Sequence, residues 1–214
     1  MGFKIERQEM DVGMTGIVLA GGKATRMGGS RDKAFLKIGG ETIIDRQLKA
    51  LRNIFKEIII VTNSPDRYRG RKGVKIISDI VRERGPAGGI YSGLLASGSF
   101  YNFIVACDMP FINEGLVGYM INNIKDFDIF VPKIDNKFHP LCGIYSKNCI
   151  SVIERQLSQG ILKVSDIFSQ LNVKFISKKM ARNFDKDLLC LENINTPRDL
   201  KNMNKKRRWP VSYE

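Results

Sequence analysis

The sequence has no long apolar run, only one histidine and one tryptophan, and four cysteines in 214 residues. A membrane-spanning helix needs about 20 consecutive apolar residues, so we expect no insertion into a membrane. The first fourteen residues, MGFKIERQEMDVGM, also lack the apolar core of a secretion signal. We therefore predict that residues 1–14 form a flexible N-terminal tail.

The four cysteines lack the C-x-x-C spacing that is typical of metal and redox sites. They stand at positions 107, 142, 149 and 190, mostly among apolar neighbours. Buried free thiols are the favoured interpretation, ahead of metal ligands or disulfides. This pattern predicts a protein of the reducing cytoplasm.

Acidic residues are too few to balance the basic ones: 35 Lys and Arg face 22 Asp and Glu, which gives a net charge of +13. Part of this charge lies in a basic C-terminal tail at residues 204–214, which we interpret as a solvated end. No RNA-binding signature of interleaved aromatic and basic residues is present elsewhere. The remaining charge is spread out and suits a small polyanionic substrate at least as well as a polynucleotide, so we expect no nucleic-acid partner.

Short runs rich in Ile and Val predict strands that are buried on both faces, because their apolar residues are nearly continuous rather than alternating. These runs span residues 16–20, 57–62, 74–78, 103–107 and 128–132, and residues 139–146 and 173–179 predict later strands. Residues 42–55 and 113–124 place apolar side chains at helical spacing between them. A terminal helix is predicted after Thr196, with Pro197 in its first turn.

Strands that alternate with helices imply crossovers and a mainly parallel sheet covered on both faces. The predicted fold class is therefore α/β, a three-layer α/β/α sandwich with a mainly parallel, mixed sheet. No internal repeat or linker interrupts the pattern. We expect a single domain at residues 15–203, between the two tails.

Chemistry-bearing residues follow four consecutive predicted strands. These are Gly21-Gly22, Asn63, Asp79 and Asp108. Open α/β sheets bind ligands at the carboxyl ends of their strands, so the four positions are candidates for one cleft. The alternative for each single Asp or Asn is that it caps a turn or the next helix.

The loop after the first predicted strand, LAGGKATRMGGSRDK, is rich in glycine and positive charge. It matches neither G-x-x-x-x-G-K-[ST] nor G-x-G-x-x-G. Gly21 and Gly22 nevertheless allow backbone N–H groups to approach phosphate oxygens closely. Arg26 offers a planar fork for phosphate, and Lys33 offers a point charge. An ordinary glycine-rich surface loop is the alternative.

Eight short motifs occur in order along the chain: LAGGKATRMGG, DKAFLKIGG, VTN, SD, ERGPAGGIYSGL, CDMPF, HPLCGIYS and NINTPRDL. Together they resemble the molybdenum cofactor guanylyltransferase family, a group of nucleotidyltransferases with the Rossmann-like nucleotide-diphosphosugar transferase fold. The resemblance spans roughly residues 15 to 203, and the extra length GGSRD before Lys33 departs from the family pattern.

The resemblance implies that GMP is transferred from GTP to the terminal phosphate of the molybdenum–molybdopterin cofactor, with release of pyrophosphate. Arg26 and Lys33 match the cationic positions of the family's loop, and Asp108 matches its Mg²⁺ ligand. These three are the candidate catalytic residues, and Asp108 is also a candidate contact to GTP. The terminal phosphate needs no general base, because it is largely dianionic at neutral pH.

Further contacts to GTP are implied for Leu19, Ala20, Gly21, Gly22 and Lys33 in the loop. Asn63 and Asp79 match positions that contact the nucleoside.

Two residues of the later part of the chain are weaker candidates. Asn195 is a candidate for the metal or pyrophosphate site. His139 is equally open to a pterin contact and to a structural role.

Three alternatives remain open from the sequence. A related enzyme attaches cytidine to the same cofactor, and others attach a nucleotide to a sugar 1-phosphate. Those relatives tend towards an LAAG loop, whereas Ala20-Gly21-Gly22 and Gly85-Pro86 favour guanine. The third alternative is a non-catalytic, basic nucleic-acid-binding protein, which Lys33 and Asp108 argue against.

Proteins that handle molybdopterin, and molybdoenzymes, are the expected protein partners.

Overall fold

The structure is a computed structural model that describes residues 13–21, 33–196, 198, 199 and 201. Apart from Gly13 and Met14, the two predicted tails lie outside these residues. So does Pro197 of the predicted terminal helix. Thr196 is described, and its Oγ1 accepts a hydrogen bond of 3.1 Å from the backbone N of Asp199. This bond is the one expected of the predicted N-cap.

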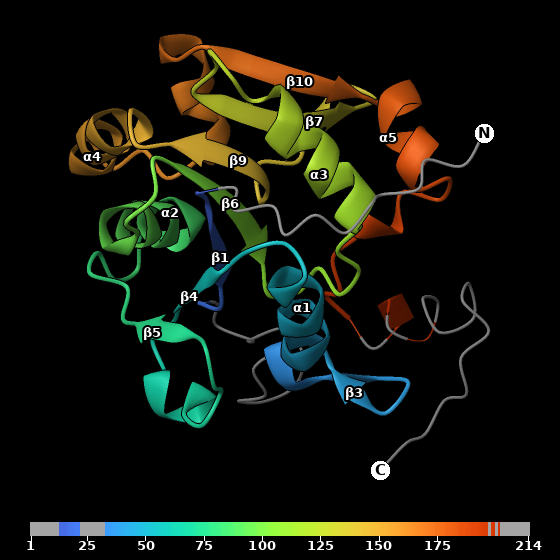
Figure 1. Cartoon of the computed structure of the whole chain (residues 1–214). Helices are drawn as coiled ribbons and strands as arrows, with labels where there is room; N and C mark the ends of the chain where they lie inside the picture. The colour runs from blue at the N-terminus through green and yellow to red at the C-terminus, as the bar shows by residue number, and fades with distance from the viewer. Residues whose placement is uncertain (1–12, 22–32, 197, 200, 202–214) are drawn as a thin grey trace.

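A mixed, mostly parallel sheet forms the centre of the described structure (Figure 1). Its strands follow the order β10-β7-β9-β6-β1-β4-β5, and β8 pairs with β7. All neighbouring pairs are parallel except those that involve β8 or β9. The bounds are β1 (Thr15–Leu19), β4 (Glu57–Val61), β5 (Lys75–Ile77), β6 (Tyr101–Ala106), β7 (Ile129–Ile134), β8 (Lys137–Phe138), β9 (Cys142–Ser146) and β10 (Val173–Ser177).

The predicted strands are confirmed, with boundaries shifted by one to three residues, and two of these shifts have a clear cause. Residues 139–141 form a turn instead of the start of a strand, because the N–H of Cys142 donates back to the carbonyl of His139. Lys178 and Lys179 belong to a helix instead of the end of β10. Ser177 ends the strand there because its hydroxyl caps that helix by accepting from the N–H of Met180.

Helices cover both faces of the sheet, as predicted (Figure 1). One face carries α1 (Ile43–Arg52), α3 (Glu114–Asn123) and α5 (Lys178–Phe184). The other carries α2 (Gly85–Ala96) and α4 (Cys149–Ser158), together with the 3₁₀ helix η4 (Val164–Gln170). The strands separate two apolar clusters: on β1, Val18 packs into the first, while Ile17 and Leu19 pack into the second.

The first predicted helix is α1, which Thr42 caps by accepting a hydrogen bond from the N–H of Asp45. Its predicted apolar stripe is buried. A short hairpin precedes α1, formed by β2 (Lys37–Ile38) and β3 (Glu41–Thr42). Before the hairpin lies the 3₁₀ helix η2 (Lys33–Phe35), and two more such helices are η3 (Pro65–Tyr68) and η5 (Leu189–Leu191).

The glycine-rich helix α2 was not predicted, because its composition is that of a loop. Its glycines allow it to lie very close to the sheet. A Cβ on Gly93 would stand 2.8 Å from Ile17 Cγ2, and one on Gly88 would stand 2.8 Å from the carbonyl oxygen of Val81. Close packing against β1 and the loop after β5 therefore explains Gly88, Gly89 and Gly93 of the GPAGGIYSGL motif.

All four cysteines are free thiols, and Cys142, Cys149 and Cys190 are buried as predicted. Burial raises the pKa of the Cys142 and Cys149 thiols to about 12. Within the described part of the chain, no helix is both long and apolar enough to span a membrane.

Gly143 on β9 offers a test of this packing. A Cβ there would lie 2.4 Å from Val131 Cγ1 and 2.8 Å from the carbonyl oxygen of Phe130. We expect Gly143→Ala to lower the free energy of unfolding by about 1–3 kcal/mol, because the core is overpacked. Urea denaturation followed by circular dichroism measures this change.

Gly118→Ala is the matched control, since a Cβ at that position of α3 meets open space. It should raise the free energy of unfolding by about 0.5–1 kcal/mol through helix propensity. Equal effects of the two substitutions would contradict the packing of β9 against β7.

Candidate active site

The carboxyl ends of four parallel strands lie side by side in the order β5-β4-β1-β6 (Figure 1). The predicted strand-end residues come just after these strands, with one residue between: Asp79 after β5, Asn63 after β4, and Gly21 after β1. Asp108 follows β6. The pairing continues past β1 and β6, because the N–H of Cys107 donates to the carbonyl of Leu19 at 3.0 Å. One edge of the sheet therefore carries all four predicted positions.

Lys33, Asp108 and Asn195 form a polar cluster at this edge. The ammonium Nζ of Lys33 donates to Asn195 Oδ1 at 2.6 Å and lies 3.5 Å from Asp108 Oδ2. The Lys33 side chain is 22% exposed and that of Asp108 is 16% exposed, so both groups still reach solvent. The longer GGSRD loop does not prevent Lys33 from reaching Asp108.

The chain after η5 holds Asp108 in place. Asn193 Nδ2 donates to Asp108 Oδ1 at 3.0 Å, and the N–H of Ile194 donates to the carbonyl of Asp108 at 2.8 Å. Asp108 is not the cap of the next helix, because Asn113 caps α3 through its bond from the N–H of Leu116. The capping alternative therefore does not explain Asp108.

A buried glutamine on α1 supports the turn that contains Asp108. Gln47 is fully buried, and its Nε2 donates at 2.8 Å to the carbonyls of both Ala106 and Met109. These two carbonyls lie on either side of Asp108 in the chain. Gln47 is not predicted from the sequence, because a polar residue within a helical pattern gives no sign of what it contacts.

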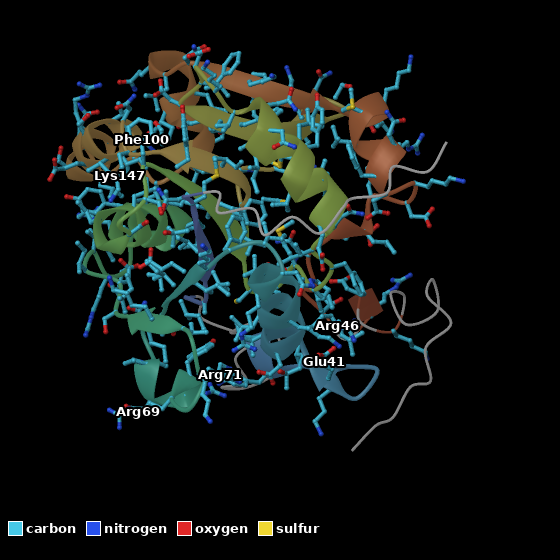
Figure 2. All side chains as sticks on the ribbon, viewed as in Figure 1. Glu41, Arg46, Arg69, Arg71, Phe100 and Lys147 are labelled. Atoms are coloured by element: carbon cyan, nitrogen blue, oxygen red, sulfur yellow. The ribbon has the colours of Figure 1, made fainter. Side chains whose placement is uncertain are left out.

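Cation–π and aromatic contacts hold η2, and with it Lys33. The guanidinium carbons of Arg67 and Arg71 lie 4.9 and 5.2 Å from the ring centroid of Phe35, and the ring of Tyr68 lies 5.1 Å away. Arg71, on the β4–β5 connection, also donates to Asp45 at the start of α1, and Figure 2 shows it beside that helix. These cation–π contacts, also missed in sequence analysis, fix the base of the Lys33 side chain.

Asp79 and Asn63 differ in burial and in the contacts of their side chains. Asp79 is buried, and its Oδ1 accepts from the N–H of Val81 and the hydroxyl of Ser92. One carboxylate oxygen thus ties the loop after β5 to α2, as the turn-capping alternative predicts. Asn63 is exposed, and its Nδ2 would lie 3.8 Å from a Cβ on Gly21. The loops after β1 and β4 are therefore neighbours.

The remaining loop candidates divide into two groups. Gly22 and Arg26 lie outside the described residues. Leu19 and Ala20 are buried, and the N–H of Ala20 donates to the carbonyl of Val61. Since the carbonyl of Leu19 accepts from Cys107, these backbone groups extend the sheet.

His139 is a half-buried side chain that bonds to the backbone of Leu191. Burial lowers the pKa of its imidazole. The neutral ring joins the β8–β9 turn to η5, which favours the structural interpretation of His139.

The residues present fit a magnesium ion better than a preformed metal centre. The described chain brings no three His, Cys, Asp or Glu residues together as a metal cage. Mg²⁺ is usually bound by one or two carboxylates together with substrate phosphates and water. The single, partly exposed carboxylate of Asp108 suits that arrangement.

The fold and the site together define a nucleotidyltransferase. A family model described as the MobA-like NTP transferase domain matches residues 16–173. This chain belongs to that family.

Relatives and solved structures agree with the family. A molybdenum cofactor guanylyltransferase of Desulfosudis oleivorans is 39% identical over 188 residues, which cover 87% of this chain and 92% of the relative. A probable molybdenum cofactor guanylyltransferase of Clostridium perfringens is 36% identical, with 89% and 96% covered. The molybdopterin-guanine dinucleotide biosynthesis protein A of Archaeoglobus fulgidus superposes with a TM-score of 0.79 at 27% identity, covering 91% of this chain and 98% of that one.

The position of Lys33 predicts that Lys33→Ala lowers the rate of nucleotidyl transfer. Losing one charge that stabilises a transition state costs on the order of 10²–10³ in rate. The free energy of unfolding should change by less than about 1 kcal/mol, the usual limit for an ion pair near the surface. Steady-state pyrophosphate release and thermal melting measure the two effects.

Lys37→Ala, on the exposed side of β2, is the control and should keep its rate. If Lys33→Ala turned over like the Lys37 variant, Lys33 would have no part in the reaction.

Proposed function

We propose that this protein transfers GMP from GTP to the terminal phosphate of the molybdenum–molybdopterin cofactor, which yields molybdopterin guanine dinucleotide and pyrophosphate. The observation that carries the proposal is the cluster of Lys33, Asp108 and Asn195 at the carboxyl edge of the sheet. The names of the relatives supply the two substrates.

The reaction needs charge stabilisation more than proton transfer. An oxygen of the acceptor phosphate attacks the α-phosphorus of GTP, and the bond from that phosphorus to the bridging oxygen of the β-phosphate breaks. Pyrophosphate leaves with the electron pair. The acceptor phosphate has a second pKa of about 6 and is largely dianionic at neutral pH, so no general base is required. The barrier is the repulsion between two anions.

Positive charge at the site lowers that repulsion. Lys33 Nζ lies among oxygens of Asp108 and Asn195, at the edge where the phosphates would lie. We assign Lys33 to the phosphate oxygens of GTP. Arg26 remains a proposed second cation from the same loop, and Gly21 and Gly22 remain proposed backbone contacts to phosphate.

Asp108 would hold Mg²⁺ against the phosphates, and the ion would neutralise part of their charge when bound. Asn193 and Gln47 keep the Asp108 turn in place for this role. Asn195 would complete the metal or pyrophosphate site through the oxygen that now accepts from Lys33.

The nucleoside is proposed to lie over β4 and β5. Asn63 is exposed beside Gly21 and can reach a ribose or base. Because Asp79 Oδ1 is engaged by Val81 and Ser92, its Oδ2 is the oxygen that we assign to the nucleoside. Leu19 and Ala20 would act in GTP binding only by forming the end of the strand that supports the loop.

The acceptor is proposed to enter from the side of β7 and β9. A cavity of about 390 Å³ lies there between the start of α2, β8 and the chain after α4. Phe138, Pro140 and Leu141 give it an apolar lining, and Lys137 and Lys163 add positive charge. Leu141 is bonded through its carbonyl to the N–H of Ala106, two residues from Asp108. A flat heterocycle with an anionic group suits these surroundings.

Three wider expectations also remain proposals. The free thiols favour a reducing compartment such as the cytoplasm. Proteins that handle molybdopterin, and molybdoenzymes, are the proposed partners. Residues 15–203 are proposed to be a single catalytic domain, flanked by tails at 1–14 and 204–214.

A nucleotide screen tests the choice of guanine. A ligand that binds only the native state raises the melting temperature by mass action. With Mg²⁺ present, we expect GTP to raise it more than ATP, CTP or UTP. A largest shift with CTP would favour cytidylyl transfer, and equal shifts with all four would contradict a guanine pocket.

Asp108→Asn tests the proposed metal role, because it keeps the size of the side chain and an acceptor for Asn193 but removes the charge. We expect guanylyl transfer to be lost across a Mg²⁺ titration while the melting temperature stays close to that of the wild type. Asp66→Asn, at an exposed carboxylate of η3, is the control. Wild-type activity of Asp108→Asn at the same Mg²⁺ requirement would refute the metal role.

A further inference from the structure

We propose that Asp199 is a positioning residue for the reaction, which acts by fixing the backbone of Asn195 and thereby the oxygen that accepts from Lys33. The inference rests on the proposed function for its catalytic meaning. Asp199 follows Asn195 by four positions in the chain. Its carboxylate acts entirely through hydrogen bonds to the main chain.

Asp199 Oδ2 accepts two backbone hydrogen bonds. One comes from the N–H of Thr196 at 2.8 Å and the other from the N–H of Asn195 at 3.0 Å. In return, the N–H of Asp199 donates to Thr196 Oγ1 at 3.1 Å. The bonds between Thr196 and Asp199 form a capping box. The bond to Asn195 lies outside that box, so a helix cap alone does not account for it.

The backbone around Asn195 is thereby held from two sides. The N–H of Ile194 donates to the carbonyl of Asp108, and the next two N–H groups donate to Asp199. The Asn195 side chain is exposed, so packing does little to orient it. Its Oδ1 is nevertheless 2.6 Å from Lys33 Nζ. The main-chain bonds are what keep this oxygen opposite the lysine.

The charge of Asp199 suits this role. The N–H of Asn195, above all other causes, lowers the pKa of the carboxyl group, and the neighbouring Thr196 and Arg198 act in the same direction. The carboxylate therefore stays ionised at neutral pH, where hydrogen bonds to a charged acceptor are stronger than neutral ones.

Kinetics of Asp199→Ala and Thr196→Ala separate positioning from helix capping. Each variant breaks the capping box, but only Asp199→Ala removes the bond to the N–H of Asn195. We expect Asp199→Ala to lower kcat about tenfold, the scale for the loss of a supporting contact, and to change KM for GTP less than about twofold. Thr196→Ala should keep kcat close to wild type. Equal losses of kcat in both variants would overturn the inference.

Two further variants test whether Asp199 acts through Asn195. Asp199→Glu should restore most of kcat, because a glutamate at this helix position can reach back to the same N–H groups. Asp199→Ala made in an Asn195→Ala background should cause little further loss, since coupled residues are not additive. A full tenfold loss in that background would overturn the proposal.

Hydrogen exchange supplies a readout that does not depend on the reaction. We expect Asp199→Ala to speed exchange of the amides at 194–196 far more than Thr196→Ala does. Unchanged exchange would refute the positioning role even if the wild-type protein proved inactive. A wild-type protein that transfers no GMP, with faster exchange in Asp199→Ala, would instead refute the proposed function alone.

Discussion

The pairing of β1 with both of its parallel neighbours is the constraint on which the site depends. Leu19 lies opposite Val61 on one side and Ala106 on the other. This register ends three strands at the same level, and bonds from Ala20 and Cys107 extend it by a residue. Gly21, Asn63 and Asp108 therefore meet at one edge. If β6 paired with β1 in a shifted register, Asp108 would move away from Lys33. The residues that β6 places in the core would still be of the same chemical type.

The chain completes the site with segments that lie far apart in sequence. Lys33 comes from a short 3₁₀ helix held by cation–π and aromatic contacts. Asn193 and Asn195 come from near the end of the described chain and contact Asp108 and Lys33. Gln47 buttresses the same turn from within the core. Such a site forms only when the whole sheet has folded. The positions of Lys33, Asp108 and Asn195 therefore depend on the stability of the fold.

Much of this arrangement can be predicted from the sequence, because buried parallel strands leave a strong pattern and their ends are marked by polar residues. The strands, α1 and α3, and the shared edge of Asn63, Asp79 and Asp108 follow from that pattern. The helix α2 does not, because glycine is selected there for close packing rather than helix propensity. Gln47 and Phe35 also cannot be predicted, since their roles arise from contacts across the fold. Asp79 caps a turn, whereas Asp108 does not cap the next helix. Only the contacts that each carboxylate makes in the fold distinguish these two roles.

The most direct measurement of the central claim is the product formed when the purified protein is given molybdopterin cofactor, Mg²⁺ and an equimolar mixture of GTP, CTP, ATP and UTP. Mass spectrometry of the released cofactor identifies which nucleotide has been attached. We expect the guanine dinucleotide as the dominant product, with one pyrophosphate released for each molecule formed. A cytosine dinucleotide as the main product, or unmodified cofactor after many hours with protein that binds GTP, would contradict it.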